Sequence, residues 1–198
     1  IPKICPKKND LNFIKNFFNS VEINSTFYHF PKPSFVKKWY KNSKEDFYFT
    51  LKLPRIISHV KKIKNTQNLM KSFYKISSNL NEKLACILIQ LPLFLKYSKE
   101  KTLEIISQIN TEINHAIEFR HISWFNEEVF DILEQNNIIY CIISHPDLPT
   151  IFRKTSDKVY IRFHGKRFLY ADNYSTEELQ KILRRNFKIK TQRSFCLL

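Results

Sequence analysis

The chain has 198 residues, of which 43% are hydrophobic and 15% are aromatic. It is therefore long and apolar enough to bury a substantial core, which excludes a disordered or low-complexity protein. It carries 33 Lys and Arg against 18 Asp and Glu, a formal net charge of +15. No run approaches the roughly 20 apolar residues of a membrane span, and the first residues do not resemble a secretory signal. We expect a cytoplasmic protein without a membrane partner.

The positive charge is of the kind that favours a nucleic-acid partner. Lysine, asparagine and isoleucine are abundant throughout, however, and glycine occurs once, as an AT-biased coding sequence would produce. The basic residues are dispersed, and no RNA-binding or zinc-finger spacing accompanies them. The four cysteines are far apart in the sequence, which does not indicate a metal site. A solvated basic surface is the expected reading, and nucleic-acid binding stays an alternative.

Short apolar runs rich in β-forming residues predict six strands, at 20–24, 47–53, 85–91, 115–120, 138–144 and 158–164. Amphipathic segments predict helices at 10–18, 33–41, 66–80, 98–110, 126–136 and 175–185. Thr66 and Ser98 are expected N-caps, and Ser175 with Glu178 forms a capping-box pattern. This alternation predicts parallel strands joined by crossover helices, in an α/β sheet or barrel.

Polar residues distinguish the two faces of the predicted strands. In HAIEFR, Glu118 and Arg120 alternate with Ile117 and Phe119, so the charged pair shares one face of the strand. Several other strands also gather polar groups toward their C-terminal ends. The central strands of an open sheet are more often apolar on both faces, whereas a (βα) barrel carries its chemistry on the C-terminal rim. The pattern favours a TIM-type barrel.

Several motifs together resemble the YecE-like family, called the domain of unknown function 72 family. They are VEINSTFY (21–28), FPKPS, FTLKLPR with nearby His59, ILIQLP, AIEFRHISWF, and VYIRFHG followed by YADNYS. The resemblance covers about residues 10–182 and implies a TIM-type barrel, without implying an activity. Members usually begin with a GTSGW-like strand and end with an Asn-rich strand, and 187–198 is atypical. We therefore expect one domain over 1–198, with six of eight strands visible and the barrel incomplete or open.

The polar residues of the strand ends are expected to meet at the C-terminal rim. We expect Glu118 or Glu22 to act as general base, His164 as acid or base partner and Lys52 as electrophilic stabiliser. Arg120 and Arg162 are the expected anion clamps. Further substrate contacts are expected from Asn24, Tyr28, Gln90, Trp124 and Tyr170. No metal ligand set is assigned, because the neighbouring cations would oppose a divalent ion.

Three functional hypotheses follow. The first is an enzyme, a hydrolase, lyase or isomerase, acting on a small phosphate- or carboxylate-bearing substrate. The second is a nucleic-acid-binding protein that uses the basic surface and the rim aromatics. The third is a truncated family member without activity of its own. The charged residues could also form a self-satisfied ionic network with no substrate. With one glycine there is no glycine-rich phosphate loop, and the sequence leaves cofactor and oligomeric state open.

Overall fold

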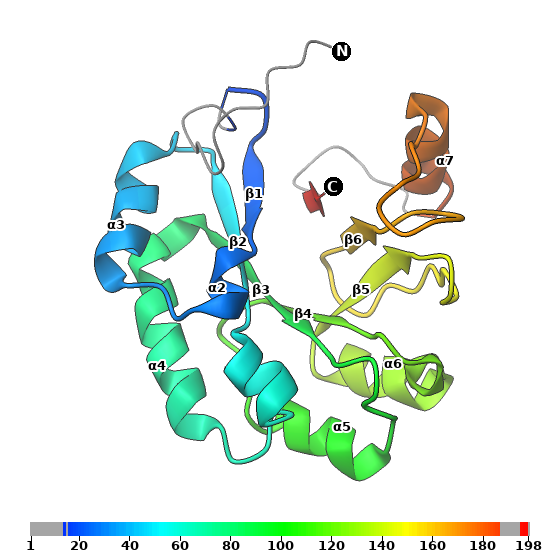
Figure 1. The fold of residues 1–198 in the computed structure, drawn as a ribbon, viewed down its shortest axis with the longest axis horizontal. Coiled ribbons are helices and arrows are strands. Elements are labelled where there is room, and N and C mark those ends of the chain that lie inside the picture. Colours follow the sequence, from blue (N-terminus) through cyan, green and yellow to red (C-terminus); the bar gives the residue numbers. More distant parts are fainter. Residues whose placement is uncertain (1–13, 15, 187–194, 198) are drawn as a thin grey trace. The chain divides into compact units, whose positions relative to one another are not determined.

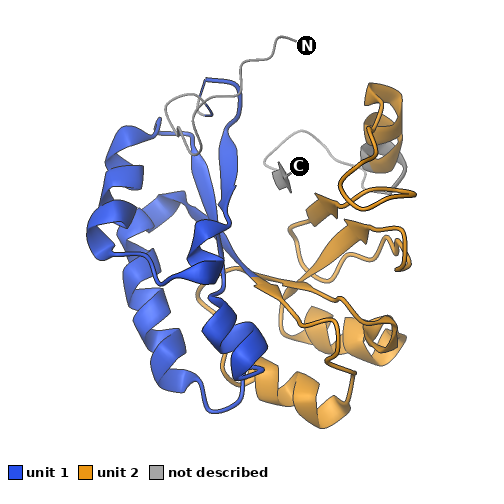
Figure 2. Ribbon diagram, viewed as in Figure 1, with its two compact units in different colours: residues 1–88 blue, residues 89–198 orange. Residues whose placement is uncertain are grey.

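A computed structural model describes residues 14, 16–186 and 195–197. The chain divides into two compact units, Ile1–Leu88 and Ile89–Leu198 (Figure 2). The boundary falls inside one strand, β3 (Leu84–Gln90). Each unit is described by itself.

The first unit contains strands and helices in alternation (Figure 1). Its elements are β1 (Ser20–Ile23), α2 (Ser25–Tyr28), α3 (Pro33–Asn42), β2 (Tyr48–Lys52), the π-helical turn η1 (Ile56–Val60), α4 (Gln67–Ser77), the 3-10 helix η2 (Ser78–Lys83) and most of β3. β1 pairs with β2 and β2 pairs with β3, both in parallel. The parallel pairing follows from the intervening helices, which return the chain to the same end of the sheet.

The second unit continues the same alternation. It contains the end of β3, α5 (Lys99–Ile106), β4 (His115–Glu118), the 3-10 turn η3 (Ile122–Trp124), α6 (Glu127–Gln135), β5 (Ile139–Ser144), β6 (Tyr160–Phe163), α7 (Thr176–Asn186) and β7 (Phe195–Leu197). Each of β4 to β6 pairs in parallel with the strand that follows it. The carboxyl ends of these strands therefore point the same way, and polar residues placed there can converge.

Helix starts follow local capping chemistry. Ser98 Oγ accepts a hydrogen bond from the Lys101 backbone N–H at 3.1 Å before α5. Ser175 and Glu178 form the predicted reciprocal capping box before α7, with N to O distances of 2.8 and 3.2 Å. Thr66 occupies the N-cap position of α4 but makes no side-chain cap hydrogen bond there. Two of the three predicted caps are therefore confirmed in their hydrogen bonding.

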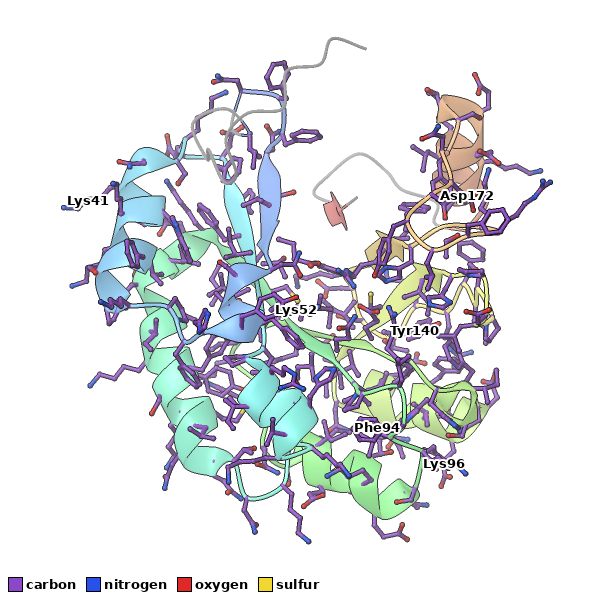
Figure 3. All side chains as sticks on the ribbon, in the orientation of Figure 1. Lys41, Lys52, Phe94, Lys96, Tyr140 and Asp172 are labelled. Atoms are coloured by element: carbon purple, nitrogen blue, oxygen red, sulfur yellow. The ribbon has the colours of Figure 1, made fainter. Side chains whose placement is uncertain are left out.

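Aromatic side chains form the main packing between strands and helices in the second unit. The Phe119 ring stacks on Trp124 with centroids 5.1 Å apart and on Tyr140 with centroids 5.8 Å apart. Tyr140, a β5 residue labelled in Figure 3, also contacts Phe130 of α6 edge-on, with ring centroids 5.0 Å apart. All four side chains are almost fully buried. Their burial removes four large aromatic surfaces from water and stabilises the second unit.

The predicted fold class is confirmed, because each unit repeats the strand, helix and parallel strand from which TIM-type barrels are built. All six predicted strands form within one or two residues of their expected bounds. A seventh, β7, lies in the segment expected to be an atypical tail. The helix expected at 10–18 lies mostly outside the described residues. No helix in the described part of the chain is long and apolar enough to cross a bilayer.

One buried hydroxyl in this core lacks a hydrogen-bond partner among the described residues, that of Tyr140. Burial raises the pKa of this hydroxyl, so it stays a protonated, unsatisfied donor. We expect Tyr140→Phe to raise the free energy of unfolding by about 1 kcal/mol, measured by urea denaturation.

The matched control is Thr155→Val, a similar loss of one buried hydroxyl. Thr155 Oγ1 donates to the Ile138 carbonyl at 2.6 Å and accepts from the Tyr140 N–H at 2.8 Å. Its removal should lower stability by about 1–3 kcal/mol. Equal losses for the two variants would show that the Tyr140 hydroxyl is satisfied.

Candidate functional site

A buried carboxylate is the centre of the polar residues in the second unit. Glu118, the last residue of β4, is fully buried. Its Oε1 accepts hydrogen bonds from Gln90 Nε2 at 2.9 Å and from Arg120 Nη1 at 2.8 Å. Its Oε2 accepts from Arg162 Nη1 at 2.5 Å, and His164 Nε2 lies 3.2 Å from Oε1. These five residues are called the Glu118 cluster below.

The surroundings of Glu118 favour its ionised form. Burial acts to raise the pKa of the carboxyl, but the hydrogen bond with His164 and the positive charges of Arg162 and Arg120 act in the opposite direction and prevail. The pKa of Glu118 therefore lies below its ordinary value. The carboxylate carries its charge throughout the neutral range, and it holds the two guanidinium groups in fixed positions.

Strand geometry explains why these side chains meet. Glu118 and Arg120 are two residues apart, so they project to the same side, while Phe119 between them packs into the aromatic core. Arg162 in β6 pairs in register with Ile143 of β5. His164 follows two residues later, and its backbone N–H donates to the Ser144 carbonyl at 2.8 Å. The cluster thus gathers at the carboxyl ends of β3, β4 and β6.

The only glycine of the chain follows His164 directly. Gly165 has φ +116, and a Cβ atom there would lie 2.0 Å from the Phe168 carbonyl oxygen, so no other residue fits without moving the backbone. The turn brings the Tyr170 backbone N–H to the His164 carbonyl at 2.7 Å and the Tyr170 ring edge-on to the imidazole at 5.7 Å. Tyr170 is 75% exposed, so it lies over His164 with one side open to solvent.

The carboxylate of Asp172 holds together the loop that contains Tyr170. Asp172, labelled in Figure 3, accepts backbone hydrogen bonds from Lys166, Arg167 and Phe168. These bonds, that of Arg167 first, lower the pKa of Asp172. The turn after β6 is therefore tied together by its own backbone donors.

His164 Nε2 has a suitable partner in either protonation state. A protonated Nε2 donates to Glu118 Oε1 at 3.2 Å, and an unprotonated Nε2 accepts from Arg162 Nη1, also at 3.2 Å. Arg120 Nη1 lies 3.4 Å away. This nitrogen therefore has a hydrogen-bond partner both with and without its proton.

Four predicted site residues belong to the first unit. Glu22, Asn24 and Tyr28 line a cavity of about 460 Å³ together with Trp39. Lys52 is 9% exposed, and its Nζ lies 4.4 Å above the centre of the Phe27 ring, a cation–π contact. The Glu118 cluster belongs to the second unit, and the roles expected for these four residues stay predictions.

The structure buries Trp124, which is expected to contact substrate at the rim. It is 1% exposed, its ring stacks on Phe119, and its indole N–H donates to the Leu95 carbonyl at 2.7 Å. Both its apolar surface and its one donor are used by the core. Trp124, the last residue of η3, packs in the core, and its expected contact with substrate stays a prediction.

One histidine near the cluster was not among the predicted site residues. His145, directly after β5, is buried, and its ring lies edge-on to that of His164 with centroids 5.9 Å apart. Burial first, and then the charges of Arg120 and His164, lower the pKa of His145. Its position in the sequence could have indicated a site residue, because His145 directly follows β5 just as His164 directly follows β6.

The chain matches the family model described as "Protein of unknown function DUF72" over residues 1–198. It belongs to the DUF72 family. It is 31% identical over 109 residues to the UPF0759 protein YecE of Escherichia coli K12, covering 54% of this chain and 40% of that relative. It is 26% identical over 183 residues to the UPF0759 protein YunF of Bacillus subtilis 168, covering 83% of this chain. The chain thus spans 40% and 64% of these two relatives.

Solved structures of DUF72 proteins share the fold. A DUF72 protein from Thermotoga maritima matches with a TM-score of 0.71 and 29% identity, covering 84% of this chain and 71% of that one. One from Enterococcus faecalis matches with a TM-score of 0.73 and 21% identity, covering 86% of this chain and 77% of that one. The resemblance expected from the sequence motifs is confirmed.

The donor set of the cluster does not favour a metal ion. Within the part of the chain that the structure describes, no group of three or more His, Cys, Asp or Glu side chains is arranged to hold one. The oxygens of Glu118 already accept hydrogen bonds from two guanidinium groups. A divalent cation placed there would be repelled by both arginines.

We expect Glu118→Gln to destabilise the second unit strongly, because Arg120 and Arg162 would remain largely buried without an anionic partner. Removal of one member of a buried ion pair costs about 3–5 kcal/mol. Urea denaturation at neutral pH measures this loss. Glu128→Gln is the matched control, since Glu128 forms an exposed ion pair with Lys99 and should change stability little. Similar losses for the two variants would contradict the buried charge network.

The same network predicts a pH dependence. The pKa of Glu118 in the folded chain lies below its ordinary value of 4.5, so its stabilising contribution is fully present above that value. The contribution is lost as the pH falls below 4.5 toward the lower folded pKa. Free energies of unfolding measured from about pH 7 to about pH 3 should fall less in Glu118→Gln than in the wild type.

Proposed function

We propose that the second unit binds a small phosphate- or carboxylate-bearing molecule through Arg120 and Arg162, and that His164 transfers a proton on it. The observation that carries this proposal is the charge of the Glu118 cluster. Two guanidinium groups and one carboxylate give +2 − 1 = +1 with His164 neutral. The Arg120 and Arg162 side chains are 12% and 15% exposed, so both are enclosed but within reach of solvent.

An enclosed excess of positive charge is costly when it serves only packing. A self-sufficient network would balance its charges, since uncompensated buried ions destabilise the fold. Here one carboxylate is shared by two arginines, and the remaining charge is positive. A bound oxyanion would complete the balance and could accept paired hydrogen bonds from each guanidinium group.

The geometry divides the roles within the proposed site. Glu118 has a lowered pKa and accepts hydrogen bonds from three residues, so it is a weak base and acts instead by positioning the arginines. His164 carries the proton transfer, because Nε2 has a partner both with and without its proton. Gln90 fixes Oε1 of Glu118, and Tyr170 covers the imidazole.

The proposal predicts anion binding that depends on guanidinium geometry. We expect isothermal titration calorimetry at low ionic strength to show phosphate binding by the intact chain. Arg120→Lys keeps the positive charge but removes the forked donors, so it should weaken phosphate binding about tenfold. Circular dichroism reports whether the variant stays folded.

Arg153→Lys provides the matched control. Arg153 faces three exposed carboxylates, those of Glu127, Asp131 and Glu134, and its replacement should leave phosphate affinity unchanged. An equal effect of the two substitutions would show that phosphate responds to overall charge, and the Arg120 and Arg162 assignment would then be wrong.

A further inference from the structure

His145 has one ring nitrogen in use and one without a partner. Its Nδ1 accepts a hydrogen bond from the Asp147 backbone N–H at 3.1 Å. This bond requires an unprotonated Nδ1, so the neutral ring carries its hydrogen on Nε2. Burial and the nearby charges of Arg120 and His164, which lower the pKa of His145, keep the ring neutral.

The Nε2–H donor is buried and has no acceptor among the described residues. The His145 side chain is 5% exposed, so bulk water does not solvate this nitrogen. Buried donors in native proteins are almost always paired with protein, water or ligand. The Nε2–H donor of His145 therefore needs an acceptor that the described residues do not supply.

The location of the ring points to a ligand acceptor. The His145 ring is edge-on to His164 at 5.9 Å, and His164 is within 3.4 Å of both Arg120 and Arg162. An oxyanion held by these arginines would lie next to the His145 ring, whose Nε2–H is short of an acceptor. A neutral N–H adds a hydrogen bond there without adding repulsion between cations.

We propose that His145 Nε2–H is a third donor of the anion site and that the site selects a phosphoryl group over a carboxylate. The proposal rests on the proposed function and names its substrate class. Arg120 follows β4 by two residues, His145 directly follows β5 and Arg162 lies in β6, so the donors approach from three separate positions. A phosphoryl group offers three terminal oxygens for them, whereas a carboxylate offers two.

The test compares inorganic phosphate with acetate as probes for the wild-type chain and His145→Phe, by calorimetry. The variant keeps an aromatic ring and removes the donor. We expect phosphate affinity to fall about tenfold and acetate affinity to stay within about twofold. Without anions, the melting temperature should stay equal or rise, because an unsatisfied donor has been removed. His115→Phe, at a buried histidine of β4, should leave phosphate affinity unchanged.

Unchanged phosphate affinity in His145→Phe would overturn this inference while the proposed function stands. An equal loss for acetate would overturn the phosphoryl selectivity. If the wild type binds neither probe, the proposed function fails and this inference fails with it. If His145→Phe does not fold, two-bond ¹H–¹⁵N spectra of the wild type decide, since phosphate should shift the Nε2 signal of His145. No shift would overturn the proposal.

Discussion

The ion pairing of Glu118 with two arginines is the constraint on which the candidate site depends. A carboxylate with no exposed surface at the end of β4 is compatible with folding only because Arg120, Arg162, Gln90 and His164 supply its hydrogen bonds. The same bonds fix the side chains that supply them. Structural stability and the proposed anion chemistry are therefore two results of one arrangement.

That arrangement assigns a different role to Glu118 than the general base expected from the sequence. A carboxyl group surrounded by guanidinium groups is a firm anchor and a weak proton acceptor. The proposed proton-transfer role belongs to His164, whose Nε2 lies between the Glu118 carboxylate and the Arg162 guanidinium. The site is thus proposed to separate positioning from chemistry, with the anchoring carboxylate on β4 and the proton-transferring imidazole just after β6.

The sequence predicted the fold and named all five residues of the Glu118 cluster for physical reasons. Strand periodicity separates Glu118 and Arg120 from Phe119, and the repeat of strand and helix requires parallel pairing. The burial of Trp124 could not be predicted in the same way. The sequence around a loop tryptophan is the same whether the side chain faces solvent or donates to a buried carbonyl such as that of Leu95. His145 was missed because its significance lies in an absent acceptor, which only three-dimensional neighbours can show.

The single glycine, Gly165, differs from the other described residues that have positive φ angles. Six other described residues hold positive φ angles between 46° and 58°, and they include Ile63, Asn81 and Tyr170. At those angles an ordinary side chain is strained but permitted. At Gly165 the angle and the Phe168 carbonyl leave no room for a Cβ atom. The chain thus places ordinary side chains at six strained positions, and its single glycine stands at the turn over His164, where a side chain has no room.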